Sequence, residues 1–444
     1  MQDMQLVSYR GPSMAGGVSG AFSSLWNCMM PEMDSWCYMD GAAITQMSRR
    51  GESVIDSIPQ YIIDGHYNFC NSFIWPVMHD MPERVDYIAH DRALYREFNR
   101  LLADAIKTVR KPRAQFVQDY QLALIPGLIA SSGYPSMIFW HIPWPKHVAA
   151  MHVPPIVELV RSMIKCDVVG FHTAEYADNF RQFAMAHIPE LRNGRLSMPQ
   201  LAVRPLGINN DSWSHNAAAK MHLFDTPQLV GLDRKQIILS VERADYTKGV
   251  VERMDAIRAF FNKYEHLRDK VSFVQVCGKT RPGLRHFDAY WKELEAEEAA
   301  LRVEFDLDKN GVNGEFRPLV WLKDPLKPTH LSLLYRDAAA MLVNPIRDGL
   351  NLTAKEFVLT QTKNAAPLLL SRGAGSFEEM GRYSLEVKPD SPDQVAHAIN
   401  RALAMGDAEK RYRHRKLVRA MESNTLQDWW MSFVEDRQLA VKRS

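Results

Sequence analysis

The strongest chemical signal lies in residues 343–356, VNPIRDGLNLTAKE. The apolar run Ala340 to Val343 before it has the character of a buried strand, and Pro345 ends strand pairing. A polar loop and good helix formers follow, which predicts a strand, a tight loop and the beginning of a helix. The free N–H groups of the first helical turn favour anionic oxygens, and Gly349 lets the backbone approach a ligand closely.

Two carboxylates belong to this stretch. Asp348 could accept hydrogen bonds from sugar hydroxyls, and Glu356, one to two turns into the helix, could accept them from a ribose diol. Taken alone, the stretch fits a helix cap beside a surface loop equally well.

A second stretch, ILSVERADYTKG at 238–249, adds positive charge. Arg243 and Lys248 follow an apolar strand in a loop that ends at Gly249. An arginine fork and a lysine point charge suit a diphosphate, and together they can hold the negative charge of a departing group without a metal ion. The alternative is a pair of solvated surface cations.

SVERADYTKG and NPIRDGLNLTAKE resemble the donor-site motifs of the trehalose-6-phosphate synthase family of glycosyltransferases. The resemblance runs from about Leu6 to Trp430, nearly the whole chain. Three more motifs carry it: LSRGAG at 370–375, GFHTAEYADNF at 170–180, and FWHIPWP at 139–145.

The resemblance implies roles for individual residues. It implies that Arg243 and Lys248 stabilise the leaving group, that Asp119 acts on the acceptor and that His141 contacts the donor sugar. The remaining donor-binding residues would be Gly17, Asp348, Gly349, Leu350, Asn351, Leu352 and Glu356. The acceptor-binding residues would be Arg10, His66, Trp75, Asp119, Gln121 and Arg281. From residue type alone, Asp119 fits a helix N-cap as well as an acid–base role, and a histidine beside a proline-rich turn is usually structural.

The chain departs from the family pattern around the acceptor. The family has HDYH where this chain has QDYQ, so Gln118 and Gln121 replace two histidines. His66 stands where the family usually has a tyrosine that binds the sugar phosphate, and Tyr67 is next to it. The first loop, residues 11–14, is also shorter than in a trehalose-type enzyme.

Composition indicates an ordinary globular enzyme. The 444 residues are 46% hydrophobic and 24% charged, and a net charge of +2 gives no sign of nucleic-acid or membrane binding. Five cysteines without a CxxC pair favour reduced thiols and no zinc site, and we expect neither a metal nor a cofactor. Without a signal-peptide pattern or a long apolar run, we expect a cytoplasmic protein.

Apolar runs alternate with helical patterns through both halves, which predicts parallel sheets in an α/β fold. We expect a domain over 1–220 and a second over 221–424. The resemblance implies the GT-B arrangement, two doubly wound Rossmann-like domains facing a central cleft, with a C-terminal helix at 425–444 returning to the first domain.

The resemblance implies a metal-independent retaining transfer of glucose from a nucleotide-glucose to a small phosphorylated acceptor. Because the acceptor residues depart from the pattern, we favour glycerol 3-phosphate, giving glucosylglycerol phosphate as a compatible solute. The alternatives are a trehalose-6-phosphate synthase using UDP-glucose and glucose 6-phosphate, and a non-catalytic sugar-phosphate sensor or pseudo-glycosyltransferase. The sequence has no phosphatase pattern, so a separate phosphatase or a domain outside it would finish the pathway. A homo-oligomer is left open.

Overall fold

The computed structural model describes residues 4–12, 17–27, 33–48, 50–108, 114–133, 135–218, 229, 231–232 and 235–441. The chain divides into two compact units. The first comprises residues 1–207 and 426–444, and the second comprises residues 208–425.

The first unit is built on an eight-stranded sheet with the order β4-β3-β2-β1-β5-β6-β7-β8. From β2 to β8 the neighbours run parallel, whereas β2-β3 and β3-β4 are antiparallel. The strands are β1 (Met4–Arg10), β2 (Met33–Asp40), β3 (Ala43–Ser48), β4 (Gly51–Ser57), β5 (Ala114–Gln118), β6 (Ser136–Trp140), β7 (Val168–Phe171) and β8 (Gln200–Val203). The alternation of apolar runs with helical patterns predicts parallel sheets, and the runs at 116–117, 137–140 and 168–171 lie in β5, β6 and β7 of this sheet.

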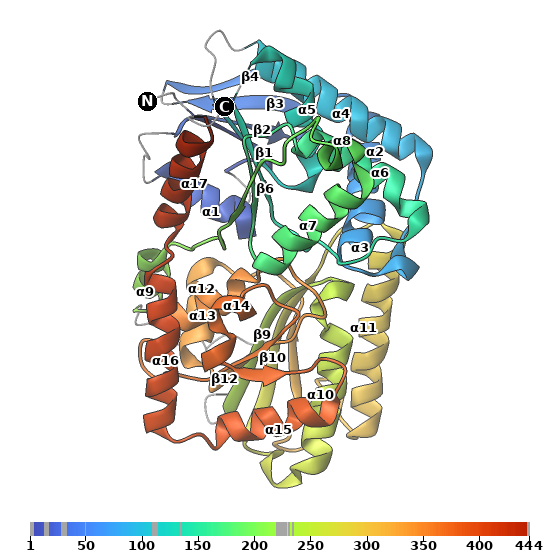
Figure 1. The fold of residues 1–444 in the computed structure, drawn as a ribbon. Helices are drawn as coiled ribbons and strands as arrows, with labels where there is room; N and C mark the ends of the chain where they lie inside the picture. The colour runs from blue at the N-terminus through green and yellow to red at the C-terminus, as the bar shows by residue number, and fades with distance from the viewer. Residues whose placement is uncertain are drawn as a thin grey trace. The chain divides into compact units, whose positions relative to one another are not determined.

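Helices cover the sheet. Figure 1 shows α1 and α17 beside each other, and α17 contacts β7 and β8. The helices of the unit are α1 (Gly17–Asn27), α2 (Gln60–Asn68), α3 (Trp75–Met78), α4 (Ala89–Lys107), α5 (Ile125–Ile129), α6 (Val153–Met163), α7 (Ala174–His187), α8 (Pro189–Arg192) and α17 (Leu426–Val441).

The C-terminal helix α17 is anchored by aromatic side chains. Trp429, Trp430 and Phe433 are buried, and Trp429 Nε1 donates to the main-chain oxygen of Arg204 at 3.0 Å. A Cβ on Gly170 of β7 would lie 2.2 Å from the Phe433 ring, so the absence of a side chain there lets the helix pack closely.

The second unit has a six-stranded parallel sheet with the order β11-β10-β9-β12-β13-β14. Its strands are β9 (Gln236–Ala244), β10 (Val271–Lys279), β11 (Leu319–Leu322), β12 (Ala340–Val343), β13 (Leu368–Ser371) and β14 (Leu385–Val387). Its helices are α9 (Asn210–Ala217), α10 (Val250–Lys263), α11 (Arg285–Glu304), α12 (Pro328–Asp337), α13 (Leu352–Thr360), α14 (Phe377–Met380), α15 (Pro392–Leu403) and α16 (Asp407–Glu422). In Figure 1, α12 and α13 lie on one side of this sheet and α10 and α11 on the other.

The division between the units falls at Gly207 and Ile208, earlier than the position after residue 220 that we expected. The reason is α9, which packs on α12 and α13 of the second unit. Arg336 Nη1 also donates to the main-chain oxygen of Ala217 at 3.1 Å.

None of the helices in the described ranges combines the length and the apolar character needed to cross a membrane.

Candidate active site

The loops that follow β9, β12 and β13 are bonded to one another in the second unit. The main-chain N–H of Ile346 donates to Thr247 O at 2.9 Å, and that of Asp348 donates to Gly373 O at 2.7 Å. Ser376 N donates to Leu350 O at 2.8 Å. Each loop follows the carboxyl end of a parallel strand, where ligands bind in sheets of this kind. The two donor-site motifs and LSRGAG therefore form one structure.

Glycines make this close approach feasible. Gly249 has φ 65°, and a Cβ there would lie 2.2 Å from Asn344 O. A Cβ on Gly375 would lie 2.0 Å from Gly349 O. Both obstacles are main-chain atoms, so a side chain at either position would push the loops apart.

Lys248 and Asp348 form a buried ion pair through Nζ and Oδ2. Their relative exposures are 7% and 8%, so each charge depends on the other for compensation. The side-chain amide of Asn351 donates to Asp348 Oδ2 at 3.1 Å and to Glu242 Oε1 at 3.2 Å. Glu242 was not among the residues predicted from the sequence. Burial raises its pKa, and the nearby Lys248 offsets part of that rise.

The same asparagine begins α13. Asn351 Oδ1 accepts from Ala354 N at 3.2 Å, and its backbone is left-handed, with φ 77°. The helix dipole and the first-turn N–H groups of α13 therefore lie next to Asp348 and Lys248. Gly349, Leu350 and Leu352 are main-chain neighbours of this cap. We call Lys248, Asp348, Asn351 and Glu242 the donor cluster.

The second unit holds two arginines with predicted roles, Arg243 at the leaving group and Arg281 at the acceptor, and they differ in exposure. Arg243 is exposed near the end of β9. Arg281 Nη1 pairs with the buried carboxylate of Asp245 at 2.7 Å, and its guanidinium carbon lies 4.7 Å from the centre of the Phe287 ring. Asp245 also accepts from the amide and the hydroxyl of Thr247. Arg281 thus braces the β9 loop, and its contact with an acceptor stays a prediction.

Glu356 lies inside the second unit, where its Oε2 accepts from the hydroxyl of Tyr335 at 3.0 Å. Burial raises the pKa of Glu356 to about 7, and the hydrogen bond from Tyr335 offsets only part of that rise.

In the first unit, three predicted residues follow neighbouring strands. Arg10 ends β1 and is exposed, Asp119 follows β5, and His141 follows β6. These strands are adjacent in the sheet. Gly17 is the first residue of α1, and Gly16 lies outside the described residues.

Asp119 has a strained backbone. Its φ of 71° and ψ of 175° belong to a region that is essentially restricted to glycine. Its N–H donates to Phe139 O at 2.8 Å, and its Oδ1 accepts from the main-chain N–H of His141 at 3.0 Å. Strain of this kind persists only where surrounding contacts compensate for it, and it clusters at functional sites.

Both ring nitrogens of His141 are engaged within the first unit. Nε2 lies 2.9 Å from Gln118 Oε1, and Nδ1 lies 3.3 Å from His172 Nε2. Burial lowers the pKa of His141 to about 3, so the ring is neutral. The contact of His141 with a donor sugar stays a prediction. From the sequence, Gln118 was a departure from the family pattern without an assigned role, and no role was predicted for His172.

His66 is a core residue. Its ring stacks on Phe98 and Tyr95, with centroid distances of 3.8 and 5.3 Å, and Nε2 lies 2.9 Å from the main-chain oxygen of Gln121. Burial lowers the pKa of His66 to about 4, so the ring is neutral. A neutral, enclosed ring favours packing, and phosphate binding by His66 stays a prediction.

Trp75 follows a π-helical segment, Phe69–Ile74, and is almost fully buried. Its ring lies 4.1 Å from that of His79 and 6.0 Å from that of Tyr120. Tyr120 is next to Asp119, so Trp75 packs against the segment that carries the strained aspartate. Irregular helical turns of this type are frequent at functional sites.

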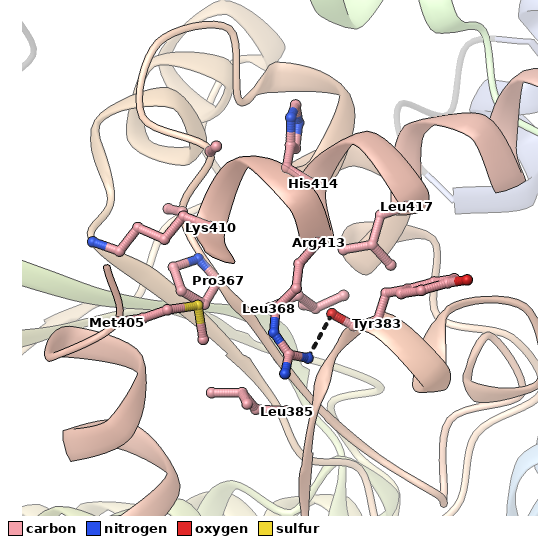
Figure 2. A pocket seen from close by; sticks show the side chains of 11 residues that line it. Pro367, Leu368, Tyr383, Leu385, Met405, Lys410, Arg413, His414 and Leu417 are labelled. Atoms are coloured by element: carbon pink, nitrogen blue, oxygen red, sulfur yellow. Dashed lines mark hydrogen bonds between the residues drawn. The ribbon is translucent and has the colours of Figure 1, made fainter. Parts of the chain in front are cut away.

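A small cavity of about 10 Å³ lies at the amino ends of β13 and β14, away from the donor cluster. That volume holds about one water molecule. Figure 2 shows that Arg413 of α16 reaches it and bonds to the main-chain oxygen of Tyr383, while His414 Nε2 lies 3.0 Å from Val358 O. Both side chains already contact main-chain carbonyl oxygens, so we assign no ligand to this cavity. Within the described ranges, no group of three His, Cys, Asp or Glu residues is placed to hold a metal ion.

We expect Asp119→Gly to be more stable than Asp119→Asn. Glycine relieves about 1–3 kcal/mol of backbone strain, whereas asparagine keeps the strain and preserves a hydrogen bond worth about 1 kcal/mol. Thermal unfolding of the two variants checks this expectation. A lower melting temperature for Asp119→Gly would show that the backbone is not strained.

We expect the folding stability of the wild type to fall as the pH rises from 5 to 8, and we expect Glu356→Gln to lose less stability over the same range. The folded-state pKa of about 7 lies above the ordinary value of 4.5, so the folded chain holds a proton that the unfolded chain releases. Stability from this group is therefore present at low pH and lost as pH rises through about 7. The difference should be on the order of 2 kcal/mol. Melting curves of both proteins at pH 5.5 and pH 8 provide the measurement, and equal pH dependence would contradict the shift.

Comparisons with known proteins agree with this geometry. Residues 23–438 match glycosyltransferase family 20. The chain is 31% identical over 399 residues to the trehalose-6-phosphate synthase of Klebsiella pneumoniae, covering 86% of this chain and 81% of that protein. It is 27% identical over 391 residues to the UDP-forming α,α-trehalose-phosphate synthase A of Dictyostelium discoideum, covering 85% of this chain but only 52% of that longer protein.

Solved structures show the same fold. An UDP-forming α,α-trehalose-phosphate synthase from Burkholderia xenovorans, in complex with glucose-6-phosphate, matches with a TM-score of 0.85 and 26% identity over 98% of this chain and 100% of that one. The GT-B fold class is confirmed by these neighbours and by the two units, one built on a mostly parallel sheet and the other on a fully parallel sheet. The chain belongs to glycosyltransferase family 20 and is a retaining glycosyltransferase.

Proposed function

We propose that the protein transfers glucose from UDP-glucose to glucose 6-phosphate, with retention of anomeric configuration, as a trehalose-6-phosphate synthase. The observation that carries the proposal is the donor cluster, in which a buried lysine, an aspartate and a helix N-terminus lie together. This set suits a ligand that combines hydroxyl groups with a diphosphate. The names of the Klebsiella and Dictyostelium relatives support the acceptor.

In the proposed reaction, the bond from the anomeric carbon to the diphosphate breaks, and a bond to an acceptor hydroxyl oxygen forms on the same face. The hydroxyl proton passes to the departing phosphate oxygen. Arg243 and Lys248 stabilise the negative charge that develops on the departing phosphate, and the first-turn N–H groups of α13 contribute further stabilisation. These groups supply enough positive charge that the proposal needs neither a metal ion nor a cofactor.

Asp348 and Asn351 would bind hydroxyls of the glucosyl group, and Glu356 would bind the ribose. The ion pair with Asp348 holds Lys248 in place before a diphosphate arrives. On the acceptor side, Arg10 would bind the phosphate and Asp119 would orient the attacking hydroxyl.

Glycerol 3-phosphate remains the second candidate acceptor because of His66. At this position the family usually has a tyrosine, whose hydroxyl binds the sugar phosphate. The buried ring of His66 exposes no donor that could replace that hydroxyl. A smaller acceptor would need fewer such contacts. The relatives reported above support glucose 6-phosphate better, so the order of the two acceptors is reversed from the one favoured by the sequence. The presence of Arg243, Lys248, Asp348 and Glu356 weighs against a non-catalytic sensor.

The acceptor is tested by mixing the purified protein with UDP-glucose and either glucose 6-phosphate or glycerol 3-phosphate, and following release of UDP. We expect release with glucose 6-phosphate and a disaccharide phosphate as product. Release with glycerol 3-phosphate alone would establish the second candidate. The proposed transfer would be rejected if neither acceptor caused release of a nucleotide from UDP-glucose, ADP-glucose or GDP-glucose.

We expect Arg243→Ala to lower kcat by a factor of about 10²–10³, since loss of one contact to a developing oxyanion costs about 2.7–4 kcal/mol. Arg401→Ala is the matched control, because the Arg401 side chain is 64% exposed on α15 and pairs only loosely with Glu409, at 3.7 Å. Steady-state kinetics of both variants provide the measurement. Turnover near that of the wild type in Arg243→Ala would remove this residue from the leaving-group site.

A further inference from the structure

A buried chain of hydrogen bonds crosses the first unit beside Asp119. It joins the side chains of Gln118, His141 and His172 and ends on the main-chain N–H of Leu206. The three side chains are 2%, 6% and 3% exposed. Each pair of neighbouring atoms lies within hydrogen-bonding distance. The two main-chain groups at the ends of the chain therefore determine which atom of each pair donates.

The first end fixes the orientation of the amide. Gln118 Nε2 donates to the main-chain oxygen of Phe116 at 3.4 Å, so Gln118 Oε1 is the atom that faces His141. An amide oxygen can only accept. His141 Nε2, at 2.9 Å, must therefore carry a hydrogen.

The second end fixes the other histidine. The N–H of Leu206 donates to His172 Nδ1 at 3.3 Å, so that nitrogen carries no hydrogen. The hydrogen of the neutral His172 ring is then on Nε2, which donates to His141 Nδ1 at 3.3 Å. All four bonds point the same way, from Leu206 to Phe116, and bonds aligned in this manner strengthen one another.

The chain also requires that both rings stay neutral. A proton on His141 Nδ1 would face the hydrogen on His172 Nε2, and the hydrogen bond between these two nitrogens would be lost. The phenylalanines that pack against the ring of His141 give no compensation for a charge; Phe139 and Phe22 lie at centroid distances of 4.6 and 6.1 Å. The carboxylate of Asp119 is bonded to the main-chain N–H of His141 instead.

We propose that Gln118 and His172 are positioning residues that act through His141 to hold the carboxylate of Asp119 where an acceptor hydroxyl is oriented. Gln118 immediately precedes Asp119, and the main chain of His141 binds Asp119 Oδ1. The ring of His141 is thereby fixed on two sides by Gln118 and His172, while the main-chain N–H of the same residue donates to Asp119 Oδ1. The part that concerns the acceptor rests on the proposed function, whereas the bond directions do not.

The chain is tested with Gln118→Met and Gln118→Glu. Methionine has a similar volume but no oxygen, so His141 Nε2–H loses its acceptor, and we expect kcat to fall about tenfold. Glutamate keeps an acceptor and should restore most of kcat at pH 8. Its charge should also raise the pKa of His141, so that kcat of Gln118→Glu falls between pH 8 and pH 6 relative to the wild type.

Gln115→Met is the control, because it makes the same substitution on the same buried strand, β5, three residues earlier. We expect its kcat to stay within about twofold of the wild type. Wild-type kcat in Gln118→Met, or equal losses in Gln115→Met and Gln118→Met, would overturn the positioning role.

A second readout does not depend on turnover. Long-range ¹H–¹⁵N spectra of protein labelled in its histidines, assigned with His141→Asn and His172→Asn, report which ring nitrogen carries the hydrogen. We expect Nε2–H for both rings from pH 5 to pH 8, and an Nδ1–H signal from either would overturn the chain. If neither acceptor causes release of UDP, the proposed function fails. The spectra still decide the directions of the hydrogen bonds in that case.

Discussion

The ion pair between Lys248 and Asp348 is the interaction on which the second unit's site depends. It joins the loop after β9 to the loop after β12, and the main-chain bonds of Asp348 with Gly373 and Gly375 extend the connection to β13. Removing one partner of a buried pair costs about 3–5 kcal/mol because the other charge is left uncompensated. The fold therefore holds the lysine cation in a nearly dry place between two loops that follow parallel strands.

The first unit uses a different device. Strain is concentrated in one residue, Asp119, and the neighbouring strands compensate for it. Its N–H bonds to the main chain of Phe139 and its carboxylate to that of His141. The aligned bonds through Gln118 and His172 then restrict the ring of His141 without adding a charge. Both units thus fix polar groups at strand ends by bonds that leave few alternative arrangements.

Much of the fold could be predicted from the sequence. The four-residue apolar run at 340–343 is a buried strand because apolar side chains on both faces need a sheet covered by helices. Gly249, Gly373 and Gly375 lie where a Cβ would strike a main-chain oxygen, so the glycines at these positions of the motifs reflect the close approach of the loops. The antiparallel strands β3 and β4 could not be predicted, since β4 is polar and largely exposed and gives no apolar signal.

The sequence by itself determined the family, the parallel sheets and the identity of the cations and carboxylates, because these follow from side-chain type and local spacing. Only the tertiary structure decided which of them face one another. In the second unit Glu242 bonds to Asn351, and in the first unit Gln118 and His172 bond to His141, each between segments that are distant in the sequence, so no local pattern records these bonds. His66 shows the same limit, because a histidine in a helix has no assigned role until its neighbours are known. The stacked rings of Phe98 and Tyr95 exclude water from it, and that exclusion sets its charge.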